Sequence, residues 1–587
     1  MAPGDDRPAP DTVAGLLLGQ ADNDDRALLF EGREWTWRQV VAESVARAAL
    51  VAGLAGLAGG GGGPGDHDGD DGDDRDDRDA GPLHLGVLLE NTDEYLFWLG
   101  GAALAGAVVV GCNTTRRGEE LARDVRSTDC GWIVTDTAGS SRLEGLDLGA
   151  ATGNLLVVDS DDYRDRLAAV AAVAAVADMA AVPLPGDRPS PDDLYLLIFT
   201  SGSTGHPKAV RMTQGRAARG ATRMPFTAED VLYCAMPLFH GNALLSAVFP
   251  WMAGGSTLAL RRRFSASAFL PDVREVGATF FNTVGRAVAH ILATPPSDHD
   301  RDHSLKFVLG PETSAPDKAA FTERFGVPLF EGYSSSEGAI VLHPVSGARP
   351  GALGRPPKGA DIAVVDPDSG APCPTARFDD SGRLLNPDEA IGELVGRNVA
   401  SSFEGYYRNP EAEAQRLRDG WYWSGDLAYR DGDGVFYFAG RSGDWLRVDS
   451  ENFTAAPVEQ ILGRMDGVRG VAVYAVPDSR TGDQVMAALE LEDGVVFDPG
   501  ALADFLAGQA DLGTKWAPRY VRVVDALPTT ATHKVDKAPL RRQQWSTTDP
   551  LWRREERGER YVPMGPDDVA ALRAEFGANG RVNLLTS

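Results

Sequence analysis

Cysteine is scarce in this sequence: its 587 residues contain four, which lie far apart at Cys112, Cys130, Cys234 and Cys373. No two of them form a CxxC pair or another metal-ligand spacing, so the sequence offers neither a disulfide framework nor a zinc-binding motif. This cysteine usage is typical of a reducing compartment, and we expect a cytoplasmic protein.

The N-terminus, MAPGDDRPAPD, lacks the basic region followed by an apolar region that marks a signal peptide. Positive charge is also in short supply, because 57 Lys and Arg stand against 85 Asp and Glu and give a formal net charge of −28. Such an acidic chain argues against nucleic acid and against an anionic membrane surface as partners. We therefore expect no nucleic-acid partner.

A membrane span is not expected either. Residues 95–112 form a run of 18 uncharged, mostly apolar residues, but four glycines interrupt it. The preceding residues, 84–94, are typical of a strand, a turn and the start of a helix. We therefore predict a buried helix over 95–105 followed by a buried strand. A second apolar run, residues 167–182, is rich in alanine, and we predict a helix there.

A tract of glycine and aspartate fills residues 59–81, which contain nine Asp and two Arg. Because such a tract cannot bury apolar surface, we predict a disordered surface insertion over 58–82. Calcium binding is the weaker interpretation, since the acidic positions do not follow the spacing of an EF-hand.

Strand-like apolar runs alternate with helical patterns over the first half of the chain, which predicts parallel βαβ units. The length of the chain allows roughly three or four units of about 150 residues. The strand-like runs lie at residues 84–91, 107–112, 131–137, 154–160, 194–199, 256–261, 278–284 and 305–312.

Residues 361–440 have a different pattern, with short strands, tight Gly/Asp turns and a predicted hairpin at 429–440. Beyond them the pattern changes again, to that of a small α+β unit. We predict an α/β protein with a large N-terminal domain of several subdomains, residues 1–443, and a small α+β C-terminal domain, residues 444–587.

The stretch FTSGSTGHPKAV (199–210) follows an apolar run and loses side-chain bulk abruptly. Its small residues leave successive main-chain N–H groups able to turn towards one anion, and Lys208 adds a positive charge, so the stretch is suited to cradle phosphate. It matches neither the P-loop nor the dinucleotide-binding pattern, and taken alone it is also compatible with a flexible turn. The candidate phosphate-binding residues are Thr200, Ser201, Gly202, Ser203, Thr204, Gly205 and Lys208.

Four more motifs follow this one along the chain. In order, the five are FTSGSTGHPKAV (199–210), EGYSSSEG (331–338), WYWSGDLAYRDGDG (421–434), FAGRSGDWLRV (438–448) and LPTTATHKVDKAPL (527–540). Together they resemble the adenylate-forming superfamily of acyl-CoA synthetases, peptide-synthetase adenylation domains and luciferases. The resemblance extends over about residues 12–560, and PLWRREERGERYVPM (550–564) is most similar to bacterial fatty-acid and very-long-chain acyl-CoA ligases.

The resemblance implies that the chain uses ATP with Mg²⁺, and CoA as a co-substrate. It places Tyr333 along the adenine, Ser336 at the α-phosphate and Glu337 on Mg²⁺. It assigns the ribose hydroxyls to Asp426, with Arg441 nearby. The GPET run (310–313) falls where the family has its adenine-binding loop.

Lys534 matches the catalytic lysine of the family, which bridges the attacking oxygen and the α-phosphate. We expect Lys537, three residues on, to be a solvated lysine. His240 matches a position near the carboxylate and the pyrophosphate exit, and a structural histidine is the alternative. Asp444 corresponds to the hinge about which the small domain of the family rotates, so we expect a mobile C-terminal domain.

Three residues depart from the family pattern. Ser334 replaces a glycine that borders the acyl carboxylate, and Ser450 replaces a glycine that faces the channel for the CoA thiol. His533 replaces the glycine that usually precedes the catalytic lysine. The first two concern the acyl group or the acceptor, and neither of these two touches the ATP site.

The leading hypothesis is an ATP-dependent acyl-CoA synthetase that forms an acyl-AMP and then an acyl-CoA. The alternatives are a diazotase that adenylates nitrite for an aromatic amine, an amide-forming ligase, and a nucleotide-binding regulator without catalysis. The acyl pocket is expected from residues 237–249 and 281–292, where the candidates are Phe239, Phe281, Asn282 and Arg286.

Overall fold

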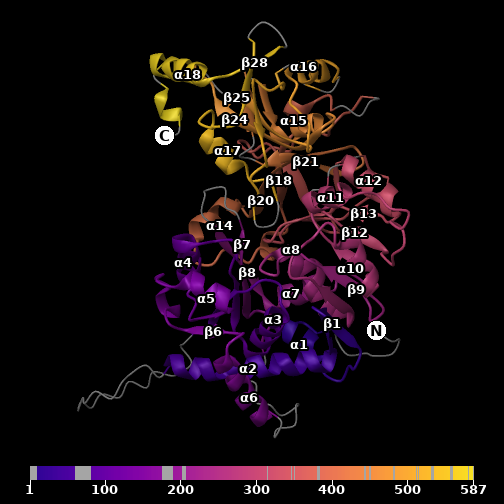
Figure 1. Cartoon of the computed structure of the whole chain (residues 1–587), viewed down its shortest axis with the longest axis vertical. Helices are drawn as coiled ribbons and strands as arrows, with labels where there is room; N and C mark the ends of the chain where they lie inside the picture. The colour runs from indigo at the N-terminus through magenta and orange to yellow at the C-terminus, as the bar shows by residue number, and fades with distance from the viewer. Residues whose placement is uncertain are drawn as a thin grey trace, which may run out of the picture. The chain divides into compact units, whose positions relative to one another are not determined.

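A computed structural model of the chain forms two compact units (Figure 1). The first comprises Met1–Phe330 and Phe403–Ala414, and the second comprises Glu331–Ser402 and Gln415–Ser587. The structure describes residues 10–59, 81–174, 189–200, 207–311, 313, 315–345, 347–349, 351–379, 384–441, 445–448, 451–479, 483–509, 512, 515–530, 534–555, 560–579 and 581–585. The insertion predicted over 58–82 lies almost entirely outside these residues, and the domain boundary predicted at 443/444 stays a prediction.

The first unit contains a seven-stranded sheet with the strand order β13-β12-β11-β9-β10-β1-β2. Its strands are β1 (Arg26–Phe30), β2 (Arg33–Thr36), β9 (Val231–Cys234), β10 (Thr257–Leu260), β11 (Phe280–Asn282), β12 (Phe307–Leu309) and β13 (Leu329–Phe330). Every neighbouring pair is parallel except β1 with β2, which forms an antiparallel edge.

A six-stranded sheet in the same unit has the order β6-β5-β3-β4-β7-β8. Its strands are β3 (His84–Leu88), β4 (Val108–Gly111), β5 (Trp132–Thr135), β6 (Leu155–Val157), β7 (Leu194–Thr200) and β8 (Lys208–Thr213). All neighbours are parallel except β7 with β8. The eight predicted runs are all strands, and strands such as β3 and β4 are buried at every position, as in sheets covered on both faces.

Helices connect these strands, which confirms the predicted βαβ organisation. They are α1 (Val13–Leu18), α2 (Trp37–Gly59), α3 (Asp93–Ala105), α4 (Gly118–Ser127), α5 (Thr137–Leu143), α6 (Asp161–Ala174), α7 (Gln214–Ala221), α8 (Gly241–Ala243), α9 (Phe249–Gly254), α10 (Phe269–Val276), α11 (Gly285–Leu292) and α12 (Ala315–Phe325). The alanine-rich helix predicted over 167–182 is thus confirmed as far as residue 174, and residues 175–182 lie outside the described residues.

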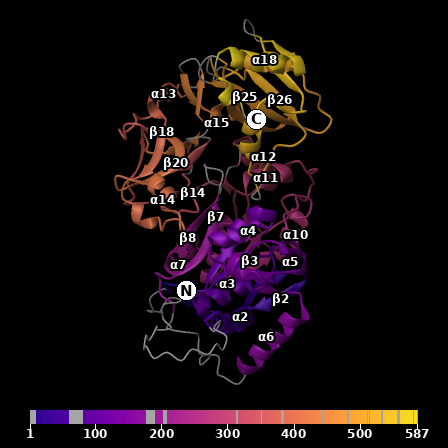
Figure 2. The same ribbon diagram turned by 90° about the vertical axis from the view of Figure 1, so that its left-hand side faces the viewer.

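The glycine-interrupted run 95–112 is a buried helix, α3, followed by β4, as predicted. Its glycines let α3 pack closely on α2, and the two helices lie side by side (Figure 2). A Cβ on Gly100 would lie 2.3 Å from Ser44 Oγ, and one on Gly101 would lie 2.5 Å from Arg47 Cβ. Across the described ranges, no helix combines the length and the apolar character that a membrane crossing requires.

The second unit begins with antiparallel structure. A sheet with the order β16-β21-β20-β18-β17 is flanked by β19 on β20, and β14 pairs with β15 and β22 with β23. The strands are β14 (Tyr333–Ser334), β15 (Val341–Leu342), β16 (Ala352–Gly354), β17 (Ile362–Val365), β18 (Gly392–Gly396), β19 (Leu417–Arg418), β20 (Trp421–Arg430), β21 (Phe436–Arg441), β22 (Trp445–Val448) and β23 (Glu451–Thr454). The predicted hairpin is β20–β21, which confirms that prediction.

The C-terminal part of this unit is a five-stranded sheet with the order β24-β25-β26-β27-β28 and helices on both faces. Its strands are β24 (Val468–Pro477), β25 (Asp483–Leu491), β26 (Tyr520–Val524), β27 (Leu551–Arg554) and β28 (Tyr561–Pro563). Apolar residues of α15 (Ala455–Leu462) and α16 (Pro499–Ala507) pack on one face, and those of α17 (Lys537–Gln543) and α18 (Pro566–Ala578) pack on the other. The predicted small α+β unit is confirmed.

We predict that Gly101→Val destabilises the protein by about 1–3 kcal/mol, because the new side chain overlaps α2, including its main chain. The matched control is Gly53→Ala in α2, where an added Cβ meets nothing within 4 Å. This control should stabilise by about 0.5–1 kcal/mol, since alanine is the better helix former. Urea unfolding midpoints measure both, and a Gly101→Val protein as stable as the wild type would contradict the close packing of α2 and α3.

Candidate nucleotide-binding and catalytic site

The predicted phosphate-binding loop joins β7 to β8 in an antiparallel hairpin. Thr200 ends β7 and Lys208 begins β8, and the two residues are partners in the ladder. Thr200 Oγ1 donates a hydrogen bond to the Lys208 carbonyl at 3.5 Å. The sheet therefore fixes both ends of the loop. Ser201, Gly202, Ser203, Thr204 and Gly205 lie outside the described residues, and their role stays a prediction.

The Lys208 side chain lies over an aromatic ring. Lys208 is 5% exposed, and its Nζ is 5.4 Å from the centroid of the Tyr406 ring, a cation–π arrangement. Tyr406 belongs to the segment 403–414, which runs along β8, so that Tyr407 N donates to the Ala209 carbonyl at 2.8 Å. Tyr406 was missed in the sequence because only the fold brings its segment to Lys208.

His240 belongs to the same unit and directly precedes α8. The helix continues as a π-helical segment, Leu244–Val248, a geometry often found at functional sites. The His240 ring is half-buried, and its centroid lies 4.6 Å from that of Phe239. Its proposed place near the substrate carboxylate stays a prediction.

In the second unit, Tyr333 and Asp426 are in direct contact. Tyr333 lies on β14 and Asp426 on β20, and the Tyr333 hydroxyl donates a hydrogen bond to Asp426 Oδ2 at 2.5 Å. Burial, with the neighbouring Asp426 carboxylate, raises the pKa of Tyr333 well above its ordinary value, so the hydroxyl remains a donor. The two residues that the sequence assigned to the adenine and the ribose of one nucleotide are thus brought together.

An irregularity in β20 presents Asp426. The register of β18 with β20 shifts along this stretch, and Gly425 adopts a left-handed conformation with φ of 73°. The Gly425 N–H donates to Glu393 Oε1 at 2.8 Å. Ser424 Oγ accepts a hydrogen bond from the Asp426 N–H at 3.0 Å and donates one to the Leu394 carbonyl at 2.7 Å. Side chains and backbone of the neighbouring strand therefore fix the turn on which Asp426 lies.

Glu393 supports the turn that carries Asp426, and this role was not predicted from the sequence. The sequence IGELVG (391–396) indicates only an ordinary buried strand. Glu393 is 5% exposed, and burial is the main reason why its pKa is raised. Arg418 Nη2 lies 3.4 Å from Glu393 Oε2 and partly offsets the cost of this burial. Arg441 is the ladder partner of Asp426 on β21, so its backbone lies beside Asp426, and its contact with the nucleotide stays a prediction.

Glu337 and Ser336 lie in the turn that follows β14, where the Gly338 N–H donates to the Ser335 carbonyl at 2.9 Å. Glu337 is 7% exposed and Ser336 is half-buried. Among the described residues, no group of three or more His, Cys, Asp or Glu side chains is placed to hold a metal ion. One buried carboxylate nevertheless fits Mg²⁺ on a nucleotide, because that ion takes one or two protein carboxylates with phosphate oxygens.

Lys534 lies in a loop between β26 and α17 that is closed by main-chain hydrogen bonds. The Thr530 N–H donates to the Lys534 carbonyl at 2.8 Å, and the Lys534 N–H donates to Thr530 Oγ1 at 3.2 Å. Nearer the two ends of the loop, the Asp536 N–H donates to the Pro528 carbonyl at 2.8 Å. The backbone at Lys534 is therefore well fixed.

The expectation that Lys537 is a solvated lysine is wrong. Its Nζ lies 2.7 Å from Glu459 Oε1, and its side chain is 15% exposed. The structure therefore separates the two lysines of this motif: Lys537 forms an ion pair in the body of the small unit, and Lys534 lies in the loop.

The candidates for the acyl pocket have different surroundings. Phe281 packs in the hydrophobic core, with its ring centroid 5.4 Å from Tyr233 and 4.8 Å from Phe269, which corrects its expected place at the pocket. Asn282 follows on the opposite face of β11 and is fully buried. Arg286 is half-buried on α11.

Two departures from the family pattern, at Ser450 and His533, lie outside the described residues, as do Asp444 and Glu312. Ser334 is described: it is exposed on β14, opposite Val341.

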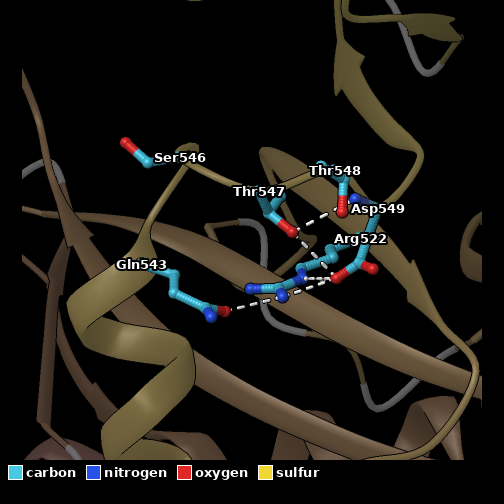
Figure 3. A pocket seen from close by; sticks show the side chains of 6 residues that line it. All are labelled: Arg522, Gln543, Ser546, Thr547, Thr548 and Asp549. Carbon is cyan, nitrogen blue, oxygen red and sulfur yellow. Dashed lines mark hydrogen bonds and ion pairs between the residues drawn. The ribbon is translucent and has the colours of Figure 1, made fainter.

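A pocket of about 550 Å³ in the second unit contains none of the predicted site residues (Figure 3). Its lining residues are Arg522, Gln543, Ser546, Thr547, Thr548 and Asp549. Arg522 Nε donates to Asp549 Oδ2 at 2.5 Å, and Arg522 Nη2 donates to Gln543 Oε1 at 2.7 Å (Figure 3). The positive charge in this pocket is matched by Asp549, and we assign the pocket no ligand.

Comparison with known families and proteins agrees with the motifs. The family model described as AMP-binding enzyme matches residues 79–407, and the model described as AMP-binding enzyme C-terminal domain matches residues 457–534. The steroid-22-oyl-CoA synthetase of Rhodococcus jostii (strain RHA1) is 49% identical over 583 residues, which cover 98% of this chain and 99% of the relative. The medium/long-chain-fatty-acid–CoA ligase FadD17 of Mycobacterium tuberculosis is 40% identical over 552 residues, which cover 93% and 99%.

Solved structures share the fold. The anthranilate CoA ligase AuaEII in complex with anthranoyl-AMP has a TM-score of 0.74 at 21% identity, over 91% of this chain and 98% of that chain. ATP-bound MatB from Rhodopseudomonas palustris has a TM-score of 0.74 at 23% identity, over 90% and 98%. The order of motifs, the family models and the full-length relatives agree: the chain belongs to the AMP-binding enzyme family, among relatives that are CoA ligases.

Proposed function

We propose that this protein is an ATP-dependent acyl-CoA synthetase. In the first step a carboxylate oxygen of the acid attacks the α-phosphorus of ATP, which forms an acyl-AMP and releases pyrophosphate. In the second step the CoA thiol displaces AMP and forms the thioester. The observation that carries this proposal is the 49% identity to a steroid-22-oyl-CoA synthetase over nearly the full length of both chains.

The described residues support a nucleotide site. Asp426, on its supported turn, accepts hydrogen bonds from the ribose hydroxyls, and Tyr333 lies beside it. Lys208, held over Tyr406, provides a positive charge for the phosphates at the end of the hairpin loop. In the same scheme Ser336 donates to the α-phosphate.

Lys534 and Glu337 act on the charge that develops during adenylation. The Lys534 ammonium donates to the attacking oxygen and to the α-phosphate, where negative charge builds in the transition state. Glu337 would hold Mg²⁺, which would neutralise phosphate charge and orient the pyrophosphate leaving group. His240 lies at the carboxylate end of the acid in this scheme.

We infer a large, mostly apolar carboxylic acid as substrate, with the side-chain carboxylate of a steroid as first candidate. The name of the 49% identical relative supports a steroid acid, and the name of the 40% identical relative supports a medium- or long-chain fatty acid. The nitrite and amide alternatives find no support in these relatives. The similarity to the amide bond synthetase McbA of Marinactinospora thermotolerans, at 23% identity, concerns the fold alone.

The decisive experiment measures AMP release and thioester formation with ATP, Mg²⁺ and a panel of acids, with and without CoA. The panel contains steroid side-chain carboxylates, fatty acids of several lengths and aryl acids, with nitrite plus an aromatic amine as a separate arm. We expect AMP and acyl-CoA in equal amounts with the steroid acids. AMP release that is indifferent to CoA, or that requires nitrite and an amine, would overturn the proposal.

We predict that Lys534→Ala lowers the rate of acid-dependent AMP release by about 10²–10³-fold, because it removes a preorganised donor to the transition state. The binding of ATP, measured by calorimetry, should change little. Lys358→Ala is a control, since Lys358 is exposed and belongs to none of the motifs. A Lys534→Ala protein with the wild-type rate would exclude this lysine from the chemistry.

We predict that Glu393→Ala weakens ATP binding, because the Gly425 N–H loses its acceptor and the turn that carries Asp426 is no longer fixed. Loss of a buried hydrogen bond to a charged group costs about 1.5–3 kcal/mol, so the KM for ATP should rise about 10–100-fold. Glu393→Gln keeps an acceptor at the same place and should lose much less. Equal KM values for Glu393→Ala and the wild type would contradict this support role.

A further inference from the structure

Two glutamates hold the ends of the loop that carries Lys534. At the start of the loop, the Leu527 N–H donates to Glu490 Oε2 at 2.8 Å, and Glu490 is 3% exposed. At the end of the loop, Lys537 Nζ lies 2.7 Å from Glu459 Oε1. The loop is therefore attached on one side to β25 and on the other to α15.

Glu459 also contacts a third element. The same oxygen, Oε1, accepts a hydrogen bond from the Val473 N–H of β24 at 2.7 Å. One carboxylate thus joins α15, β24 and the first residue of α17. The side chains of Lys537 and Glu459 are 15% and 23% exposed, so this pair is largely shielded from the solvent screening that weakens surface ion pairs.

Helix formation does not explain why a lysine stands at position 537. Lys537 is the first residue of α17, where the partial positive charge of the helix N-terminus disfavours a cation. Asp536 already caps this helix, since its side chain accepts a hydrogen bond from the Ala538 N–H at 2.9 Å. The Lys537 charge therefore does not stabilise the helix, and Glu459 provides it with an anionic partner.

We propose that Lys537 and Glu459 are positioning residues for adenylation: their ion pair sets the place of Lys534, three residues earlier. This inference rests on the proposed function, since it assumes that Lys534 acts on the α-phosphate. The catalytic contact of Lys534 is sensitive to small displacements, and a shift of about 1 Å in a positioned group costs up to about 10²-fold in rate. The Lys537–Glu459 pair touches no substrate in this scheme.

The test uses acid-dependent exchange of pyrophosphate into ATP, which reports adenylation alone, in the full-length protein. Lys537→Met should lower the exchange rate about 10–100-fold, and Lys537→Arg, which keeps the charge, should restore most of it. Glu459→Gln, which keeps an acceptor for Val473 but loses the charge, should resemble Lys537→Met. The KM for ATP should change little in all three, because the ribose and phosphate residues are untouched.

A double-mutant cycle separates positioning from general stability. If Lys537 acts through Lys534, then Lys537→Met should have no further effect in a Lys534→Ala protein. Asp549→Asn is the matched control, since it removes the charge partner of Arg522 in the same unit and leaves Glu459, Lys537 and Lys534 unchanged (Figure 3). It should lower the unfolding temperature and leave the exchange rate near that of the wild type.

Amide hydrogen exchange gives a readout that needs no substrate: the amides of Leu527, Thr529, Thr530 and residues 534–536 should exchange faster in Lys537→Met than in the wild type. The inference is overturned if Lys537→Met and Glu459→Gln adenylate at the wild-type rate, or if Lys537→Met is as harmful without Lys534 as with it. Protected amides in the loop of Lys537→Met would also overturn it. A wild-type protein that adenylates none of the acids would instead overturn the proposed function.

Discussion

A segment that leaves a sheet to carry functional side chains loses ladder partners for its own main chain, so its N–H groups need acceptors from elsewhere. In this chain glutamates meet that need. Among the described residues, five main-chain N–H groups in loops, at strand ends or along strands donate to glutamate carboxylates at 2.7–2.8 Å. The pairs are Thr213 with Glu404, Tyr406 with Glu413, Gly425 with Glu393, Val473 with Glu459, and Leu527 with Glu490.

These bonds are energetically significant because an ionised acceptor makes a stronger hydrogen bond than a neutral one. Each contributes about 1.5–3 kcal/mol, in a protein whose whole stability is expected to be about 5–15 kcal/mol. Part of the acidic surplus of this sequence is therefore structural. Glu393 and Glu490, at 5% and 3% exposed, are held inside the protein, and their replacement would alter the backbone of a site without touching a ligand.

Most of the fold could be predicted from the sequence. A buried parallel strand is a near-continuous run of apolar residues, and such a run can be identified without knowing which strand it pairs with. The motif residues could be located because the five motifs resemble those of the adenylate-forming superfamily, and the roles that this resemblance assigns to them stay predictions. What escaped prediction depends on distant segments. Tyr406 meets Lys208, and Glu393 meets Gly425, only after folding. Phe281 was misplaced because one residue decides which face of β11 a side chain takes.

The contact of Glu459 with Val473 has a consequence for the edge strand of the five-stranded C-terminal sheet. β24 is the first strand in the order β24-β25-β26-β27-β28, so one side of its backbone has no neighbouring strand in that sheet. An exposed edge strand is a template on which another chain can pair and aggregate. The Val473 N–H on this edge already donates a hydrogen bond to Glu459. The carboxylate that forms the ion pair with Lys537 therefore also makes this part of the edge less able to pair with another chain.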